Sequence, residues 1–231
     1  LQDDCLVEGV QLVIAICEKN KLHKNIIVYN NGGFKMKTIL FVNACMRERG
    51  ESRTLELFDS FIESYMQKHS DVKLIEEKLY KMNLKPLSKF DIERRDSFIS
   101  KSDYSDKMFN LAHNFYQADK IIIAAPYWDL SFPSILKVYV ENICVNGITF
   151  CYTENGPKGL CKFTDLMYIT TSGGFIAEND FGKDYINGIA KFLGNGNFMD
   201  FSAQGLDIFD IDEKNVMHKA CSDIARLADG F

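Results

Sequence analysis

From residue 36 to the end of the chain, short hydrophobic runs alternate with amphipathic stretches. The runs are rich in Ile, Leu, Val and Phe and have the length of buried strands, whereas the stretches between them place apolar residues three or four positions apart, as helices do. The expected strands are 38–43, 72–78, 120–125, 166–171 and 198–204, and the expected helices are 52–69, 103–117, 133–143, 180–193 and 212–228. This order predicts an α/β fold with a doubly wound, five-stranded parallel sheet and helices on both faces.

The third expected strand is the most hydrophobic, because its isoleucines are consecutive rather than alternating with polar residues. Such a run is typical of a strand covered on both faces in a parallel sheet. An aromatic loop, Pro126 to Pro133, follows it, and we expect Pro133 in the first turn of the next helix. Ligands of open α/β sheets bind beyond the carboxyl ends of the strands. This loop is therefore our first candidate for a functional site.

Two segments do not follow the alternation. Residues 84–102 form a long charged connection, which we interpret as a lid or as disorder. Residues 1–35 end in the turn signal Asn30 to Gly33, and Met36 then opens a strand as a native amino terminus would. We therefore divide the chain into an amino-terminal extension, 1–35, and a main domain, 36–231. Whether the extension is non-native or a helix packed on the core stays open.

Composition narrows the functional classes. The 231 residues are 46% hydrophobic and carry a net charge of −5, which suits one large core and gives no basic surface for nucleic acid. No hydrophobic stretch approaches the roughly 18–20 residues that cross a membrane. The seven cysteines include no CxxC pair and the four histidines are scattered, so we expect reduced thiols and no metal site. Acidic residues precede the apolar run Val10 to Cys17, unlike a signal peptide. These features predict a cytoplasmic protein.

The loop after the first strand carries the second candidate site. It leads into a helix at Ser52, and the free N–H groups of a helix start bind anions, so Ser52, Arg53 and Thr54 are candidates to hold a phosphate. Arg47 and Arg53 favour an anion, although Ser52 could serve only as an N-cap. The same helix start would lower the pKa of Cys45. The loop is neither a P-loop nor a GxGxxG turn.

A third loop, Thr170 to Phe175, follows the fourth strand and contains Gly173 and Gly174. Two glycines allow the backbone to approach a flat ligand closely, although an isolated Gly-Gly pair is more often an ordinary turn. Because three strand ends each carry an unusual loop, a shared ligand is the better interpretation.

These loops resemble those of a known family. Pro126 to Leu130, Gly147 to Leu160 and Thr170 to Gly174 are similar to segments of the FMN-dependent NAD(P)H:quinone oxidoreductases and azoreductases of flavodoxin-like fold. The second segment, with its Thr-Phe-x-Tyr-Thr-Glu-Asn-Gly-Pro core, is the most specific. The resemblance extends over roughly residues 37–229.

The resemblance implies an FMN site in the main domain. The phosphate would bind at Ser52 to Thr54, the isoalloxazine edge along Tyr127 to Leu130, and the pyrimidine end at Thr171 to Gly174. The implied cofactor contacts are Cys45, Arg47, Ser52, Arg53, Thr54, Pro126, Tyr127, Trp128, Asp129, Leu130, Thr171, Ser172, Gly173 and Gly174. The implied substrate contacts are Trp128, Phe150, Tyr152 and Phe175. Members of the family are homodimers with flavin sites at the interface.

The implied activity needs no catalytic side chain, because the cofactor carries the chemistry. Hydride from NADH or NADPH would pass through flavin N5 to a quinone, azo or nitro compound. Asp129 and Ser172 stand where family members often have Asn and Arg, so the side-chain contacts to the flavin differ here. A carboxylate at position 129 would disfavour a negatively charged reduced ring.

Two other functions share the fold. A flavodoxin-type electron carrier would bind FMN without a substrate pocket, and a non-catalytic sensor would bind flavin without turnover. The segment Cys144 to Leu160 argues against the carrier, because a small carrier needs only a short turn there. The sequence does not distinguish NADH from NADPH, nor does it identify the physiological acceptor.

Overall fold

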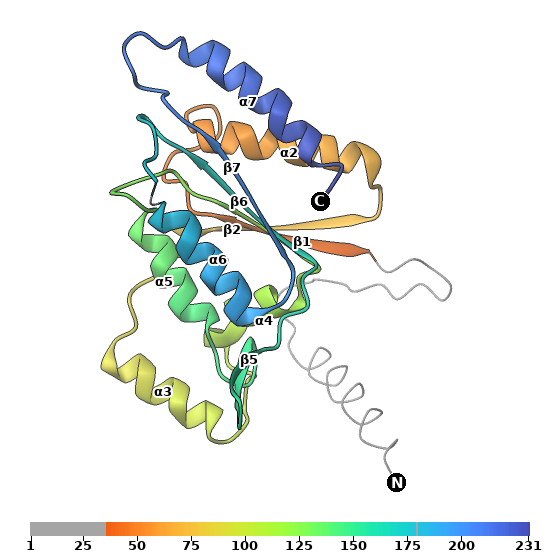
Figure 1. Ribbon diagram of the computed structural model, residues 1–231. Helices are drawn as coiled ribbons and strands as arrows, with labels where there is room; N and C mark the ends of the chain where they lie inside the picture. The colour runs from red at the N-terminus through yellow and green to blue at the C-terminus, as the bar shows by residue number, and fades with distance from the viewer. Residues whose placement is uncertain (1–35, 179) are drawn as a thin grey trace. The chain divides into compact units, whose positions relative to one another are not determined.

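The computed structural model describes residues 36–178 and 180–231, so the expected extension, 1–35, lies outside the described residues. A five-stranded sheet with strand order β2-β1-β3-β6-β7 forms the centre, and every neighbouring pair is parallel (Figure 1). Its strands are β1 (Lys37–Asn43), β2 (Val72–Lys78), β3 (Lys120–Ala124), β6 (Asp165–Thr171) and β7 (Asn197–Ala203). All five predicted strands are therefore confirmed to within a residue at either end.

Helices cover both faces of the sheet, as predicted. The helices are α2 (Arg53–Lys68), α3 (Lys89–Ile99), α4 (Asn110–Gln117), α5 (Ser134–Ile143), α6 (Phe181–Leu193) and α7 (Glu213–Leu227). Helices α2 and α7 pack on one face, and α4, α5 and α6 on the other (Figure 1). In β3, Ile121 and Ile123 face the second group and Ile122 faces the first, and all three are buried. The consecutive isoleucines reflect this two-sided burial.

The connection 84–102 is ordered, so the predicted alternative of disorder was wrong, whereas the alternative of a lid stays a prediction. It contains α3, which begins at a capping box in which Ser88 and Asp91 bond each other's backbone N–H groups. No residue of α3 is buried, so the helix has no apolar stripe that a sequence pattern would reveal. The next helix, α4, starts at Asn110 rather than 103, because the Asp106 carboxylate accepts the N–H of Met108 and starts a short 3₁₀ turn first.

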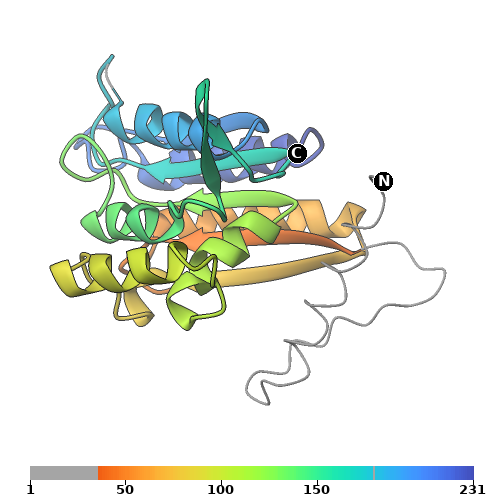
Figure 2. The ribbon, with the colours of Figure 1, turned by 90° about the horizontal axis from the view of Figure 1, so that it is seen from below.

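A two-stranded antiparallel hairpin, β4 (Phe150–Thr153) and β5 (Gly156–Gly159), was not predicted as strands. Gly156, with φ of 101°, closes its turn in a conformation that favours glycine. The hairpin lies beside the last turn of α6, where the rings of Phe150 and Phe192 have centroids 4.9 Å apart (Figures 1 and 2). That turn lies at the amino ends of the strands, because α6 ends at Leu193 and β7 begins shortly after it, at Asn197.

The strand order places a topological switch point between β1 and β3. The chain leaves β1 for β2 on one side and then returns to β3 on the other, so the connections that follow β1 and β3 cross opposite faces of the sheet. In doubly wound sheets, ligands bind beyond the carboxyl ends at such a switch point. The loops that follow β1, β3 and β6 all emerge at this edge.

Candidate functional site

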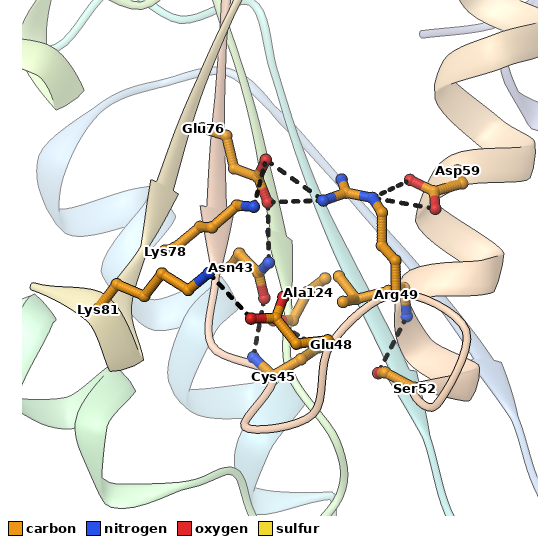
Figure 3. A network of polar contacts seen from close by, with 11 residues as sticks. Asn43, Cys45, Glu48, Arg49, Ser52, Asp59, Glu76, Lys78, Lys81 and Ala124 are labelled. Carbon is orange, nitrogen blue, oxygen red and sulfur yellow. Dashed lines mark hydrogen bonds and ion pairs between the residues drawn. The ribbon is translucent and has the colours of Figure 1, made fainter.

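The loop after β1 is anchored to neighbouring strands. Ala44 N–H donates to Ala124 O (2.9 Å), and Cys45 N–H donates to the Asn43 side chain (3.0 Å). Asn43 in turn donates to Glu76, which also binds Arg49 (Figure 3). These bonds give the start of the loop a fixed path to the first turn of α2.

The start of α2 offers free donors. Ser52 is the N-cap of this helix, because its side chain accepts a hydrogen bond from the N–H of Leu55. The N-cap role offered for Ser52 in the sequence analysis is therefore confirmed. Within the described residues, the N–H groups of Arg53 and Thr54 donate no hydrogen bond, so they stay available to an anion. The buried hydroxyls of Thr54 and Thr171 lie 2.6 Å apart and join this turn to the end of β6.

The other polar candidates in this loop differ in their surroundings. Cys45 is buried, and burial raises the pKa of its thiol to about 11, so the expected lowering of that pKa was wrong: loss of solvation outweighs the donors nearby. Arg47 is exposed. Arg53 is ion-paired with Asp207 (2.7 Å) and Glu213 (3.3 Å), so its charge is already compensated within the chain.

The aromatic loop after β3 forms a tight turn. Trp128 and Ser131 exchange two backbone hydrogen bonds, Trp128 N–H to Ser131 O (3.0 Å) and Ser131 N–H to Trp128 O (2.8 Å). Between them, Asp129 and Leu130 have φ of 49° and 67°, a left-handed conformation that costs a residue such as Leu about 1 kcal/mol or more. Their N–H groups donate no hydrogen bond in the described part of the chain. The turn thus presents two free donors and the exposed side chains of Trp128 and Leu130.

Before this turn, Pro126 and Tyr127 carry the chain away from the end of β3. Tyr127 N–H donates to Thr171 O (2.9 Å), so the loops after β3 and β6 lie side by side. Both residues are half-buried. Pro133 is the N-cap of α5 rather than a residue of its first turn, because its ψ of 140° is not helical.

The loop after β6 is shaped by Ser172 and the two glycines. The Ser172 hydroxyl donates to Gly174 O (2.6 Å), which turns that side chain into its own loop. Gly173 and Gly174 N–H groups have no acceptor among the described residues. A Cβ at Gly173 would lie 2.2 Å from Asp207 Oδ2, so any other residue there would displace the Asp207 side chain. Phe175 follows and is 71% exposed.

The structure therefore brings three of the predicted loops together and leaves the hairpin apart. The cofactor candidates after β1, β3 and β6 meet at the carboxyl edge of the sheet, with Trp128 and Phe175 among them. Phe150 is buried against α6 at the opposite end, and Tyr152 is exposed on the same hairpin. Within one chain, these two residues do not reach the other candidates.

Sequence reasoning missed Asp207 and Glu213, the carboxylates that bind Arg53. They lie in the loop after β7 and the first turn of α7. The available signal was positional, because Asp207 follows the fifth strand at the same edge of the sheet as the other loops.

Comparison with known proteins agrees with this architecture. The model of the family described as flavodoxin-like fold matches residues 37–227. The FMN-dependent NADH:quinone oxidoreductase 2 of Clostridium acetobutylicum is 34% identical over 209 residues, which cover 85% of this chain and all of that protein. The chain belongs to this flavodoxin-like family. A second member, the FMN-dependent NADH:quinone oxidoreductase of Coprothermobacter proteolyticus, is 36% identical over 202 residues, again 85% of this chain and all of that protein.

Solved structures of other proteins show the same fold. The azoreductase of Bacillus anthracis strain Sterne superposes with a TM-score of 0.75 at 24% identity, covering 85% of this chain and all of that one. An FMN-dependent NADH-azoreductase of the Ames Ancestor strain, solved with FMN, has a TM-score of 0.73 at 23% identity, covering 84% of this chain and 99% of that one.

The loops of this flavodoxin-like chain fit FMN. The cofactor has a phosphate and a flat ring with carbonyl oxygens at one end, so it requires N–H donors at two places. The start of α2 offers free N–H groups for an anion, and the loops after β3 and β6 each offer two more, at Asp129, Leu130, Gly173 and Gly174. In residues 36–178 and 180–231 no group of three potential metal ligands occurs, and no helix is long and apolar enough to cross a membrane.

Proposed function

We propose that this protein is an FMN-dependent NADH:quinone oxidoreductase. The observation that carries the proposal is the convergence of free N–H donors from three loops at one edge of the sheet. Relatives that match the chain over their whole length carry this activity in their names, with NADH as the donor. NADH is therefore the donor we propose, although the residues alone left NADPH open.

The cofactor would be held mainly by backbone. Ser52 to Thr54 would bind the phosphate, Tyr127 to Leu130 would follow the ring edge, and Thr171 to Gly174 would bind the pyrimidine end. When bound, FMN supplies two-electron transfer between the nicotinamide and the acceptor. The protein orients both partners, and its Asp129 and Ser172 side chains replace the Asn and Arg that family members often have.

Exposed apolar side chains at the rim suit flat acceptors. Three apolar side chains of the flavin loops stay largely exposed in the single chain: Trp128 (48%), Leu130 (59%) and Phe175 (71%). Aromatic surfaces of this kind bind planar molecules by stacking. Quinones are the acceptors we propose, with azo and nitro compounds as further substrates.

A homodimer would explain the position of the hairpin. Tyr152 is 71% exposed and lies at the opposite end of the sheet from the flavin loops of its own chain. A contact between Tyr152 and the substrate therefore requires a second copy. Light scattering coupled to gel filtration would show twice the mass of one chain, whereas a monomer would remove the role of Tyr152. We place the enzyme in the cytoplasm, in accord with the five free thiols of the described residues.

Steady-state turnover tests the activity. Under anaerobic conditions, FMN-loaded protein should oxidise NADH beyond one equivalent per flavin only when menadione is added, and Trp128→Ala should raise the KM for menadione several-fold. The control is Tyr116→Ala, which removes another part-exposed aromatic residue from α4, away from the three loops. Flavin binding without NADH oxidation would instead favour the electron carrier or the sensor.

A further inference from the structure

An ion pair connects the loop that starts α2 to the loop after β7. Arg53 Nη1 lies 2.7 Å from Asp207 Oδ1, and Nη2 lies 3.3 Å from Asp207 Oδ2, so the contact is bidentate. The same Nη1 also donates to Leu206 O (3.2 Å) and to Glu213 (3.3 Å). A planar guanidinium held at four oxygens has one preferred orientation.

Asp207 also touches the third loop of the site. Its N–H donates to Gly173 O (2.9 Å), and its carboxylate occupies the space where a Cβ of residue 173 would lie. The buried hydroxyls of Thr54, one residue after Arg53, and Thr171, two residues before Gly173, form a second bond between the same two parts of the site. Asp207 therefore fixes the Gly173 loop with respect to the start of α2.

The charges around Arg53 show that it is not a free cation for a phosphate. One guanidinium faces two carboxylates, Asp207 and Glu213, so the group has a net charge of −1. The hydrogen bond from Arg53 lowers the pKa of Asp207, which keeps that carboxylate ionised. An incoming phosphate would have to displace carboxylates to reach the guanidinium, whereas the N–H groups of Arg53 and Thr54 need no rearrangement.

We propose that Asp207 is a positioning residue for FMN that acts through Arg53. It directs the guanidinium away from the phosphate and holds the Gly173 loop in place for the flavin ring. The phosphate is then bound by backbone N–H groups and hydroxyls. This inference rests on the proposed FMN function, because it assigns parts of the same site.

Riboflavin, which lacks the phosphate, separates positioning from phosphate binding. The flavin-depleted wild type, Asp207→Asn, Arg53→Met and the double variant are titrated with FMN and with riboflavin by fluorescence quenching, after circular dichroism has confirmed folding. Because a part-exposed ion pair contributes modestly, each single variant should weaken both flavins by a similar factor of about two to five. The ratio of the two dissociation constants should stay at the wild-type value, and the double variant should be no weaker than Arg53→Met.

The control is Asp210→Asn, which removes the same charge from the same loop, where Asp210 is exposed and makes no ion pair within the described residues. It should leave both affinities unchanged. A riboflavin-to-FMN ratio that falls more than about tenfold in Arg53→Met would show that Arg53 binds the phosphate and would overturn the proposal. Tighter FMN binding by Asp207→Asn, or unchanged affinities in both single variants, would also overturn it. A wild-type protein that binds neither flavin would refute the proposed function itself. That failure is distinguishable from failure of the inference, because it is seen without any variant.

Discussion

Removal of one hydroxyl from the Thr54–Thr171 pair should destabilise the protein measurably. The two Oγ1 atoms lie 2.6 Å apart, and the residues are 1% and 7% exposed. Thr54→Val keeps the shape of the side chain but leaves the Thr171 hydroxyl buried without its partner. Loss of one partner of a buried hydrogen bond costs about 1–3 kcal/mol. For a domain of about 200 residues this corresponds to a fall in Tm of about 2–12 °C.

The double variant tests whether the loss comes from the unpaired group. Thr54→Val combined with Thr171→Val removes both hydroxyls, so it should be clearly more stable than the sum of the single losses predicts. Urea unfolding with an unchanged slope would measure each free energy of unfolding. Ser60→Ala serves as control, because its hydroxyl is exposed in the same helix and should change stability by less than about 0.5 kcal/mol. Single losses below that value, or strictly additive losses, would refute the reasoning.

Four further predictions follow from buried or strained groups. Lys120→Met should cost about 3–5 kcal/mol in urea unfolding, because it leaves the Asp165 carboxylate buried and unpaired; a loss below about 1 kcal/mol would contradict this. Burial raises the pKa of Glu77, so the folded protein favours the protonated carboxyl. This contribution to stability is complete below the unfolded pKa of about 4.3 and is lost as the pH rises through the folded pKa. Glu77→Gln should therefore stabilise the protein at pH 7 and not at pH 4, in paired thermal scans. The Cys45 thiol, with a pKa of about 11, should resist iodoacetamide at pH 8 in mass-spectrometric mapping until the protein is unfolded; rapid labelling of the native protein would show that it is accessible. Asp129→Asn should raise the flavin midpoint potential by on the order of 10 mV in a redox titration, and an unchanged potential would remove the tuning role of that charge.

The sheet could be predicted from the sequence because its strands are buried on both faces. Consecutive isoleucines in β3 have few other stable locations, and parallel pairing follows from the helices between strands. In contrast, α3 has no buried residue, and its sequence lacks the apolar periodicity on which helix prediction depends. The hairpin was obscured because two of its eight strand residues are glycines and one is proline, residues that usually indicate loops.

The site was predictable as three loops but not as a set of contacts. Parallel strands bring their carboxyl ends to one edge, so the loops after β1, β3 and β6 had to meet. The Arg53 partner Asp207 lies 154 residues away in the chain, and only the folded structure places the two together. The location of Tyr152 could not be predicted either. Its sequence motif is specific, but only the structure places its hairpin at the other end of the sheet.

The absorption spectrum of the purified protein under anaerobic conditions tests the central claim most directly. With FMN bound, the flavin bands should bleach when NADH is added and return when menadione follows. That sequence would establish two successive two-electron transfers through one cofactor. A protein that binds FMN but whose bands do not change with NADH would contradict the reductase activity, and a protein that binds no FMN would contradict the flavin site.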